Sequence, residues 1–548
     1  MITFLKQRMK LLDYSDMIKI LSLFLFLGFI YPAMTQEWPS IQQLGGSGNE
    51  ECFALHITNE KHLYVAGSFQ ASMNFADVAV SANGDSDAFL AKYDEEGRPL
   101  WIRSGGGVLD DQITSITEDS NGNLICIGSY WLEAAFEDTT LVTNTSPKAI
   151  LVLKYNPSGD LLWAKSIDGT TLKEATDLTV DVHNNIFITG FFEDQLILED
   201  TTLQSVGESD LFILKLTPTG QMEWVYSDGY KGDTRAMSLA LTSNDDLIIG
   251  GFYNDTTRLG DYELAANTAD RDVFLLRMTQ AGEVLWAKRA GGVHDDEIVG
   301  LALDESDHIY VTGYLVGVMN LSNQLSIQSG NGNSDFYLMQ YHPDGQVLQA
   351  RAMGGTQVQQ TTDIQWVEDQ VVISGYYFGS MIIDGNNLNA GGIVSGFVAS
   401  FSTDDLSANW IISIDGDQTV VVNQARIDES GTPWIAGTFA GALLFENTFN
   451  SNGGFDLFFG PIQSPVTATK EEAGDTPILK VFPNPARTVL FVETNLNNYH
   501  VALINMKGQL IKSGKNLTRL NIENIPKGMY TVLVNNPEHH FIRKVIVE

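Results

Sequence analysis

Acidic side chains recur at two places of one repeating phrase, and clustered carboxylate oxygens are the ligands that hard cations such as Ca²⁺ prefer. The first set opens an expected β-strand in five repeats: Asp87, Asp210, Asp272, Asp335 and Asp456. Lys148 and Ser395 occupy the two remaining places. The second set lies between a Gly-Gly pair and the next expected strand, and it comprises Glu50, Asp110, Asp111, Asp233, Asp295 and Asp296.

Two interpretations of these carboxylates stay open. As a metal site, the second set would line an acidic funnel that holds Ca²⁺, with the ligands Asp110, Asp111, Asp233, Asp295 and Asp296. As structure, each Asp accepts backbone N–H groups within its own turn. Repetition favours the structural interpretation, because a binding site usually departs from the symmetry of its repeats. No other cofactor is expected.

Other catalytic signatures are missing from the sequence. The nine histidines form no His-x-His or His-Glu-x-x-His motif, and no Gly-x-Ser-x-Gly elbow occurs. Gly-Gly pairs such as Gly106-Gly107 are interpreted as turns with positive φ rather than phosphate loops. Cys52 and Cys126 fall at different places of the repeat, which favours two separate buried thiols over a disulfide.

A repeat of about 62 residues positions these side chains. Its marker residues are spaced by 61 to 63 residues: Trp38, Trp101, Trp163, Trp224, Trp286, Gln349 and Trp410. A fixed period of this size indicates a repeat architecture, and the tryptophans are interpreted as packing residues rather than sugar platforms. Each unit carries four short, β-branched or aromatic-rich runs bounded by turn residues. Seven units of four strands predict an all-β, seven-bladed β-propeller.

The two ends of the repeat region predict how the ring closes. The last unit holds three strands, Val422–Asp428, Thr432–Phe439 and Asp456–Ile462, and lacks a fourth. Trp38–Leu44 is an unmatched fourth strand at the start. Pairing these ends would remove the free edges of an open array.

The repeat also resembles a known family. The phrase is clearest in Asp87–Gly107, and its second half is partly kept in Asp119–Gly128 and Asp304–Gly313. It is similar to the bacterial β-propeller repeats called SBBP repeats, over roughly residues 37–462. This resemblance implies a fold and no particular chemistry, because one fold hosts many functions.

The N-terminus has the pattern of a targeting segment. Four basic residues precede the uncharged apolar run Ile20–Ile30, which is short for a membrane span. We expect a signal peptide over residues 1–35, cleaved before Gln36, a propeller over 36–462 and a linker over 463–476. No later stretch is apolar enough for a transmembrane anchor of the mature chain.

Residues 477–548 form a second module with the opposite charge balance. They hold nine Lys and Arg against four Asp and Glu, and seven short strand signals predict a small β-sandwich. The module resembles the type A C-terminal sorting domain of the type IX secretion system. The residues that carry this resemblance include Pro483, Asn484, Pro485, Gly508, Gly528, Tyr530 and Lys544. It implies export by that machinery, removal by a sortase-like protease, and a secreted or outer-surface destination.

Charge and motifs together narrow the function. The chain carries a net charge of −36, which excludes nucleic-acid binding by a basic surface. The leading hypothesis is a secreted or cell-surface scaffold for binding or adhesion, with a glycan or protein as ligand. One alternative is an extracellular carbohydrate-active enzyme, a lyase or hydrolase, that uses carboxylates at the channel mouth. Another is a structural component of a surface layer.

Overall fold

The computed structural model describes residues 41–266, 268–322, 325–330, 333–445, 448–462, 479–482, 486–494, 499–505, 510–523, 525–535 and 540–547. Every helix or strand in these ranges is a β-strand, which confirms the all-β prediction. The chain divides into two compact units, Met1–Pro465 and Val466–Glu548. The expected signal peptide (1–35) and linker (463–476) lie outside the described residues.

The first unit is built from four-stranded antiparallel sheets, here called blades. In blade 1, β2 (Glu50–Ile57), β3 (Leu63–Phe69), β6 (Asp87–Tyr93) and β7 (Pro99–Gly105) pair in this order. Every residue of β3 and β6 is buried, since both faces of a blade pack against neighbouring blades. A short hairpin, β4 (Ser72–Phe75) with β5 (Val78–Ser81), joins the two middle strands.

Among the described residues, seven such groups follow one another. The bounds for blades 2 to 4 are β8 (Gln112–Glu118), β9 (Leu124–Trp131), β12 (Lys148–Tyr155), β13 (Leu161–Gly169); β14 (Lys173–Val180), β15 (Ile186–Phe192), β18 (Asp210–Leu216), β19 (Met222–Asp228); β20 (Thr234–Leu241), β21 (Leu247–Tyr253), β24 (Asp272–Met278), β25 (Val284–Ala290). Those for blades 5 to 7 are β26 (Asp296–Leu303), β27 (Ile309–Val316), β30 (Ser334–Tyr341), β31 (Val347–Gly355); β32 (Gln359–Val367), β33 (Gln370–Ile383), β34 (Asn386–Ser402), β35 (Ala408–Gly416); β36 (Thr419–Ile427), β37 (Pro433–Leu444), β38 (Thr448–Pro461). The connecting hairpins are β10 (Glu133–Phe136) with β11 (Thr139–Val142), β16 (Gln195–Leu198) with β17 (Thr201–Gln204), β22 (Thr256–Leu259) with β23 (Tyr262–Ala265), and β28 (Val318–Asn320) with β29 (Ser326–Gln328).

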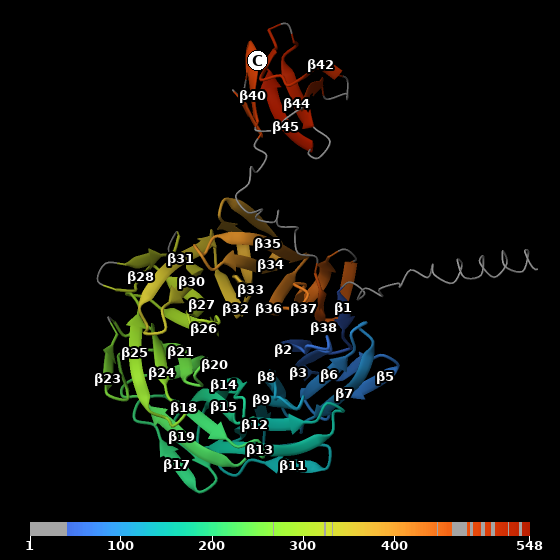
Figure 1. The fold of residues 1–548 in the computed structure, drawn as a ribbon. Helices are drawn as coiled ribbons and strands as arrows, with labels where there is room; N and C mark the ends of the chain where they lie inside the picture. Colours follow the sequence, from blue (N-terminus) through green and yellow to red (C-terminus); the bar gives the residue numbers. More distant parts are fainter. Residues whose placement is uncertain are drawn as a thin grey trace, which may run out of the picture. The chain divides into compact units, whose positions relative to one another are not determined.

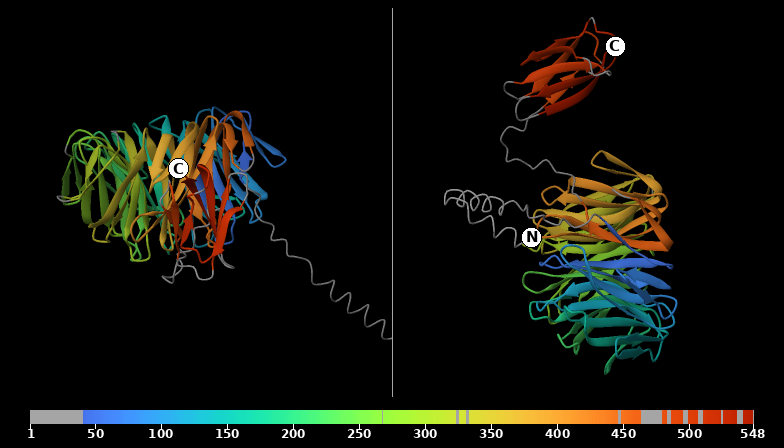
Figure 2. Two further views of the ribbon diagram at one scale, coloured as in Figure 1. Left: turned by 90° about the horizontal axis from the view of Figure 1, so that it is seen from above. Right: turned by 90° about the vertical axis from the view of Figure 1, so that its right-hand side faces the viewer.

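The blades are arranged as a closed ring. The first strand of each blade contacts the first strand of the next, and β36 of the last group contacts β2 of the first. These first strands lie nearest the centre of the ring, and the hairpins lie at its periphery (Figure 1). Seen from the side, the propeller unit is a thick disc (Figure 2). The β-propeller fold is therefore confirmed.

Strand β1 (Gln42–Leu44) completes the last blade. It pairs antiparallel with β38, and Gln42 lies opposite Phe459 while Leu44 lies opposite Leu457. The pairing of the propeller's two ends is thus as predicted, although β1 starts at Gln42 rather than at Trp38, which lies outside the described residues. Ile41 and Leu44 on either side of this strand are buried in different core clusters.

The repeated tryptophans pack one blade on the next. The indole N–H groups of Trp101, Trp163 and Trp224 donate to the carbonyls of Pro157, Pro218 and Gln280, in the turn before the fourth strand of the following blade. Gln349, at the same place in blade 5, donates to the carbonyl of Thr403 at 3.1 Å. The marker side chains therefore serve structure, and a glutamine amide replaces the indole donor where Trp is missing.

The second unit is a small sandwich of two sheets. One sheet holds β39 (Leu479–Phe482), β40 (Val489–Thr494) and β43 (Arg519–Asn521). The other holds β42 (Leu510–Lys515), β41 (His500–Asn505), β44 (Gly528–Asn535) and β45 (His540–Val547), in that spatial order. Both sheets contribute side chains to one apolar core, so the predicted β-sandwich is confirmed.

The two cysteines are separate buried thiols. Cys52 lies in the core cluster between blades 7 and 1, and Cys126 lies in the cluster between blades 1 and 2. Both are free, as the sequence indicated.

Candidate functional site

The first set of aspartates is buried at the start of the third strands. Asp87, Asp210 and Asp456 are at most 1 % exposed. Each accepts a backbone N–H of the preceding loop, as Asp210 does from Val206 at 2.8 Å and Gly207 at 3.1 Å. These carboxylates fix the loop conformation and face the interior of the blade, which supports their structural interpretation.

The Gly-Gly pairs have a different role from the one expected. Gly106, Gly291 and Gly354 do not have the positive φ predicted for turns. A Cβ at Gly291 would lie 2.0 Å from a carboxylate oxygen of Asp272, and one at Gly354 would lie 2.0 Å from Asp335. The prediction of positive-φ turns is therefore wrong, because glycine is needed here to leave room for the aspartate.

The register also corrects one assignment within the first set. Ala149, rather than Lys148, lies at the Asp87 position of blade 2, because Ala149 pairs with Tyr130 as Asp87 pairs with Phe69. In this blade the first position of the Gly-Gly pair is Asp168, whose carboxylate accepts the N–H of Asn144 at 2.7 Å.

The same exchange is seen in blade 6. There Ser395 takes the strand position, and its hydroxyl donates to Asp415 at 2.6 Å. The carboxylate thus comes either from the first residue of the third strand or from the first position of the Gly-Gly pair. Whichever of these two positions lacks the carboxylate carries a small residue.

The second set joins successive blades. Glu50, Asp111 and Asp296 are fully buried and precede or open the first strands β2, β8 and β26. Gly46 donates its N–H to Glu50 at 2.9 Å, and Gly107 donates to Asp111 at 2.6 Å. The pKa of Glu50 and of Asp111 is raised to about 7 and that of Asp296 to about 8. Burial is the main cause, and the nearby aspartates Asp456, Asp87 and Asp272 contribute to the rise.

The other members of the second set, of which Asp110 and Asp295 are exposed and Asp233 is half-buried, bind the preceding blade. Asp110 accepts the hydroxyl of Ser86 at 2.9 Å, Asp233 accepts that of Ser209 at 2.7 Å, and Asp295 accepts the N–H of Arg271 at 3.1 Å. The structure thus brings both acidic sets to one face of the ring. Within the described ranges, no three His, Cys, Asp or Glu side chains are grouped as metal ligands, so Ca²⁺ binding at these residues stays a hypothesis.

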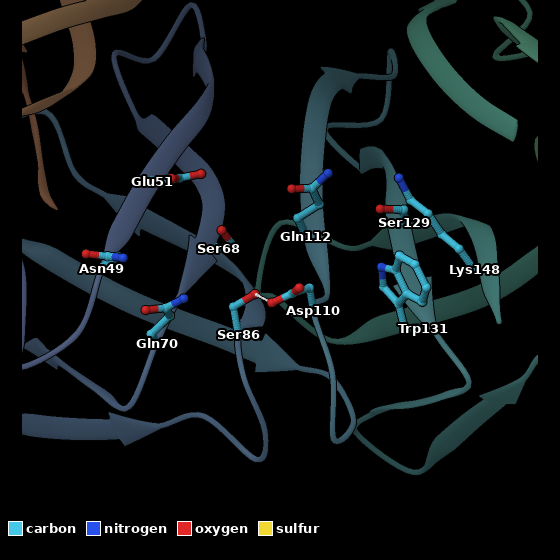
Figure 3. A pocket seen from close by; sticks show the side chains of 10 residues that line it. All are labelled: Asn49, Glu51, Ser68, Gln70, Ser86, Asp110, Gln112, Ser129, Trp131 and Lys148. Carbon is cyan, nitrogen blue, oxygen red and sulfur yellow. Dashed lines mark hydrogen bonds between the residues drawn. The ribbon is translucent and has the colours of Figure 1, made fainter. Parts of the chain in front are cut away.

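A polar pocket opens on this face between blades 1 and 2, with a cavity of about 340 Å³ (Figure 3). We call it the blade 1–2 pocket. Its lining residues are Asn49, Glu51, Ser68, Gln70, Ser86, Asp110, Gln112, Ser129, Trp131 and Lys148. Seven of these ten side chains are uncharged amides, hydroxyls or indole, so the pocket suits a polar ligand.

Two small residues explain why the hollow lies here. Ser68 pairs with Glu51 in blade 1, and Ser129 pairs with Gln112 in blade 2. The same register position holds a large aromatic ring in the next four blades: Phe191, Phe252, Tyr314 and Tyr376. Because a hydroxymethyl group replaces a ring twice in succession, space remains between the two blades.

Trp131 and Lys148 also depart from the repeat. They form a cross-strand pair between β9 and β12. In blade 1 the corresponding residues are Gln70 and Ser86, the neighbours of the paired Phe69 and Asp87. The indole of Trp131 borders the cavity below Lys148, opposite the side chains of Glu51, Ser68 and Gln70 (Figure 3).

Two of the three charged side chains of the pocket, Lys148 and Asp110, already interact with other side chains. The ammonium of Lys148 lies 2.9 Å from the carboxylate of Glu174. Asp110 accepts the Ser86 hydroxyl (Figure 3). Burial, and to a smaller extent Asp110, raises the pKa of Glu51. What remains available is a set of uncharged hydrogen-bonding groups beside one indole.

Sequence reasoning identified one pocket residue, Asp110, and missed the others. The signal was present in an alignment of the seven repeats through the glycines equivalent to Gly67. In that alignment Ser68 and Ser129 fall in a column that is aromatic in blades 3 to 6 and holds Thr438 in blade 7. Departures from the repeat, rather than the repeated acids, mark the site.

The C-terminal residues provide the identification. Tyr530 is buried in the core of the second unit, and its hydroxyl donates to the carbonyl of Pro526 at 2.7 Å. Gly528 starts β44, and Lys544 lies opposite Thr531 on β45. Residues 480–548 match the family model described as secretion system C-terminal sorting domain. The second unit is a C-terminal sorting domain.

The sorting domain determines where the protein goes. It directs the chain through the type IX secretion system to the cell surface or the extracellular space, as predicted. Pro483, Asn484, Pro485 and Gly508 lie outside the described residues. No helix in the described ranges is long and apolar enough to cross a membrane.

Relatives of the propeller region are distant. An uncharacterized WD repeat-containing protein of Acanthamoeba polyphaga mimivirus is 23% identical over 68% of this chain and 32% of its own length. The regulatory protein FlaEY of Caulobacter vibrioides is 27% identical over 75% of this chain and 44% of its own length. The chain therefore spans less than half of these relatives. A WD-repeat relative fits a repeat β-propeller, and the SBBP resemblance stays a prediction.

Similar solved structures include the extracellular domain of a putative one component system from B. thetaiotaomicron and a europium-containing methanol dehydrogenase. The first is 10% identical, covers 91% of this chain and 92% of that chain, and has a TM-score of 0.18. The second is 8% identical, covers 74% and 80%, and has a TM-score of 0.32. Likenesses at this level carry no functional argument.

Proposed function

We propose that the protein is an exported binding module whose SBBP-type propeller holds an extracellular ligand in the blade 1–2 pocket. The observation that carries this proposal is the local loss of symmetry. Ser68 and Ser129 open a cavity where the following four blades carry aromatic rings, and Trp131 and Lys148 line it. The sorting domain supports an extracellular ligand, because it exports the chain.

The binding hypothesis accounts for the pocket better than the alternatives. A lyase or hydrolase would need a set of reactive groups, and the described acidic residues at this face mostly hold backbone or hydroxyl partners. A purely structural surface-layer component would not need an open polar cavity. Adhesion follows if the bound ligand is part of a surface.

Filling the pocket tests the proposal. Tyrosine occupies the Ser129 position in blades 5 and 6, so Ser129→Tyr is expected to fold. Purified secreted protein is screened against arrays of glycans, of extracellular matrix proteins and of polyamines. Ser129→Tyr should lose at least tenfold in affinity for a ligand that the wild type and the control Ser129→Ala bind. If every ligand binds Ser129→Tyr as it binds the wild type, the pocket is not the binding site.

A further inference from the structure

The blade 1–2 pocket offers hydrogen-bonding groups that have no partner in the protein. Within the described residues, the side chains of Ser68, Gln70, Gln112 and Ser129 make no hydrogen bond, although all four border the cavity. Amide and hydroxyl groups both donate and accept. Their complement is a ligand that also does both at several neighbouring positions, which is the property of a polyhydroxylated molecule.

The indole of Trp131 adds a flat apolar surface to these groups. The indole N–H groups of Trp101, Trp163 and Trp224 donate to carbonyls of the next blade, whereas the indole N–H of Trp131 has no partner among the described residues. The backbone N–H of Trp131 donates to Asp111 at 3.0 Å. The negative face of an aromatic ring attracts the slightly positive C–H groups of a ligand. One face of a pyranose ring presents such C–H groups, while its hydroxyls point outward from the ring edge.

Charge argues against an acidic ligand. Glu51 and Asp110 both face the cavity, and the Lys148 ammonium that would attract an anion is already paired with Glu174 at 2.9 Å. The chain as a whole carries a net charge of −36. A uronate or phosphate would therefore be repelled at the pocket and during its approach.

Size agrees with a short stretch of glycan. The cavity of about 340 Å³ lies at the lower end of the range for small-ligand sites, and it holds about one or two sugar rings. The polar lining is unsuited to a lipid or an aromatic cofactor, since such ligands leave amides and hydroxyls unpaired.

We propose that the blade 1–2 pocket binds an uncharged pyranose unit of an extracellular glycan, which stacks on Trp131 and exchanges hydrogen bonds with Gln70, Gln112, Ser68 and Ser129. This inference rests on the proposed function, because it names the ligand class of the same pocket. It assigns Trp131 as the platform and Glu51 with Asp110 as the residues that reject acidic sugars.

The test is calorimetric titration of the purified secreted protein with defined hexasaccharides. The neutral probes are hexamers of β-1,4-glucose, β-1,4-xylose, β-1,4-mannose and β-1,3-glucose, and the acidic probe is a hexamer of galacturonate. Phe378→Ala is the matched control, since Phe378 is the aromatic residue of blade 6 that follows Tyr377, as Trp131 follows Tyr130 in blade 2. We expect at least one neutral hexamer to bind, Trp131→Ala to weaken it at least tenfold, and Phe378→Ala to leave it within twofold.

Three outcomes overturn the inference: no neutral hexamer binds, the galacturonate hexamer binds as tightly, or Trp131→Ala binds like the wild type. Its failure is distinguishable from failure of the proposed function. If the ligand lost by Ser129→Tyr is a protein or a polyamine and no hexasaccharide binds, the pocket is a binding site and the saccharide assignment is wrong.

Discussion

Single buried carboxylates accept backbone hydrogen bonds where one blade connects to the next. The environment of each carboxylate determines its pKa. Asp296 is fully buried next to Asp272, and its pKa of about 8 reflects first the loss of water and then this neighbour. At the equivalent place of the next junction the chain carries Gln359, which accepts the N–H of Gly355 at 2.8 Å without a charge. The residue type at this place is therefore set by hydrogen bonding, and a charge is costly.

Replacing Asp296 by its uncharged isostere should make the protein more stable at alkaline pH. The folded-state pKa is raised from 3.8 to about 8, so the stabilising effect of the protonated form is full below pH 3.8 and is lost as pH rises toward about 8. Asp296→Asn keeps an acceptor for the backbone N–H groups and removes this loss. We expect its melting temperature to exceed that of the wild type by about 2 °C or more at pH 8.

The pH dependence of the difference is the decisive measurement for Asp296. Thermal unfolding of both proteins followed from pH 4 to pH 8 should show a difference near zero at pH 4 that grows with pH. A difference that stays constant over this range, or a less stable variant at pH 8, would contradict the assigned protonation.

At the scale of elements, a short strand and the loops between strands connect the blades to one another. Strand β1 has three residues, yet it supplies the fourth strand of the last blade and links core clusters on both sides of it through Ile41 and Leu44. The acidic sets lie where the loops lead into the third and first strands, and the pocket lies at one junction between blades. The proposed ligand site thus lies at one junction of an otherwise repeated arrangement.

Removing the closing strand should destabilise the propeller and promote aggregation. Deleting residues 37–44 removes the buried side chains of Ile41 and Leu44, worth roughly 1.5–3 kcal/mol each, and exposes the edge of β38. The deletion should lower the melting temperature and increase light scattering on heating. The matched control deletes eight residues within 463–476 and should do neither. Equal effects of the two deletions would show that β1 does not close the ring.

The whole molecule combines an acidic propeller with a basic sorting domain in separate compact units. The first unit contains its own closed ring and core clusters, and the second contains its own core. Each unit therefore has a core of its own on which it can fold, which fits a C-terminal domain that serves export.

Deleting the sorting domain should separate folding from export. Without residues 477–548 the propeller should remain folded by circular dichroism and accumulate in the periplasm. Trp131→Ala, which retains the sorting domain, should still reach the surface or the medium.

Mass spectrometry of the exported wild type should find a chain that begins at Gln36 and ends within the linker. An intact Glu548 on surface protein would contradict removal of the domain.

The sequence by itself determined the all-β class, the repeat, the pairing of the two ends and the export signal. These depend on local patterns: the spacing of Trp101 and its equivalents, the missing fourth strand of the last unit, and the motif around Gly528 and Tyr530. The spacing of a repeat is a property of the sequence, so it can be recognised without the three-dimensional structure.

Only the tertiary structure decided what the individual residues do. It showed that residue 291 must be glycine because the carboxylate of Asp272 lies against it. It also showed that Asp168 supplies the carboxylate in blade 2, where Ala149 stands at the position of Asp87. It also placed Ser68 and Ser129, 61 residues apart, on the walls of one pocket. Such roles depend on contacts between strands and between blades, and a linear pattern does not specify which side chains fill the same space.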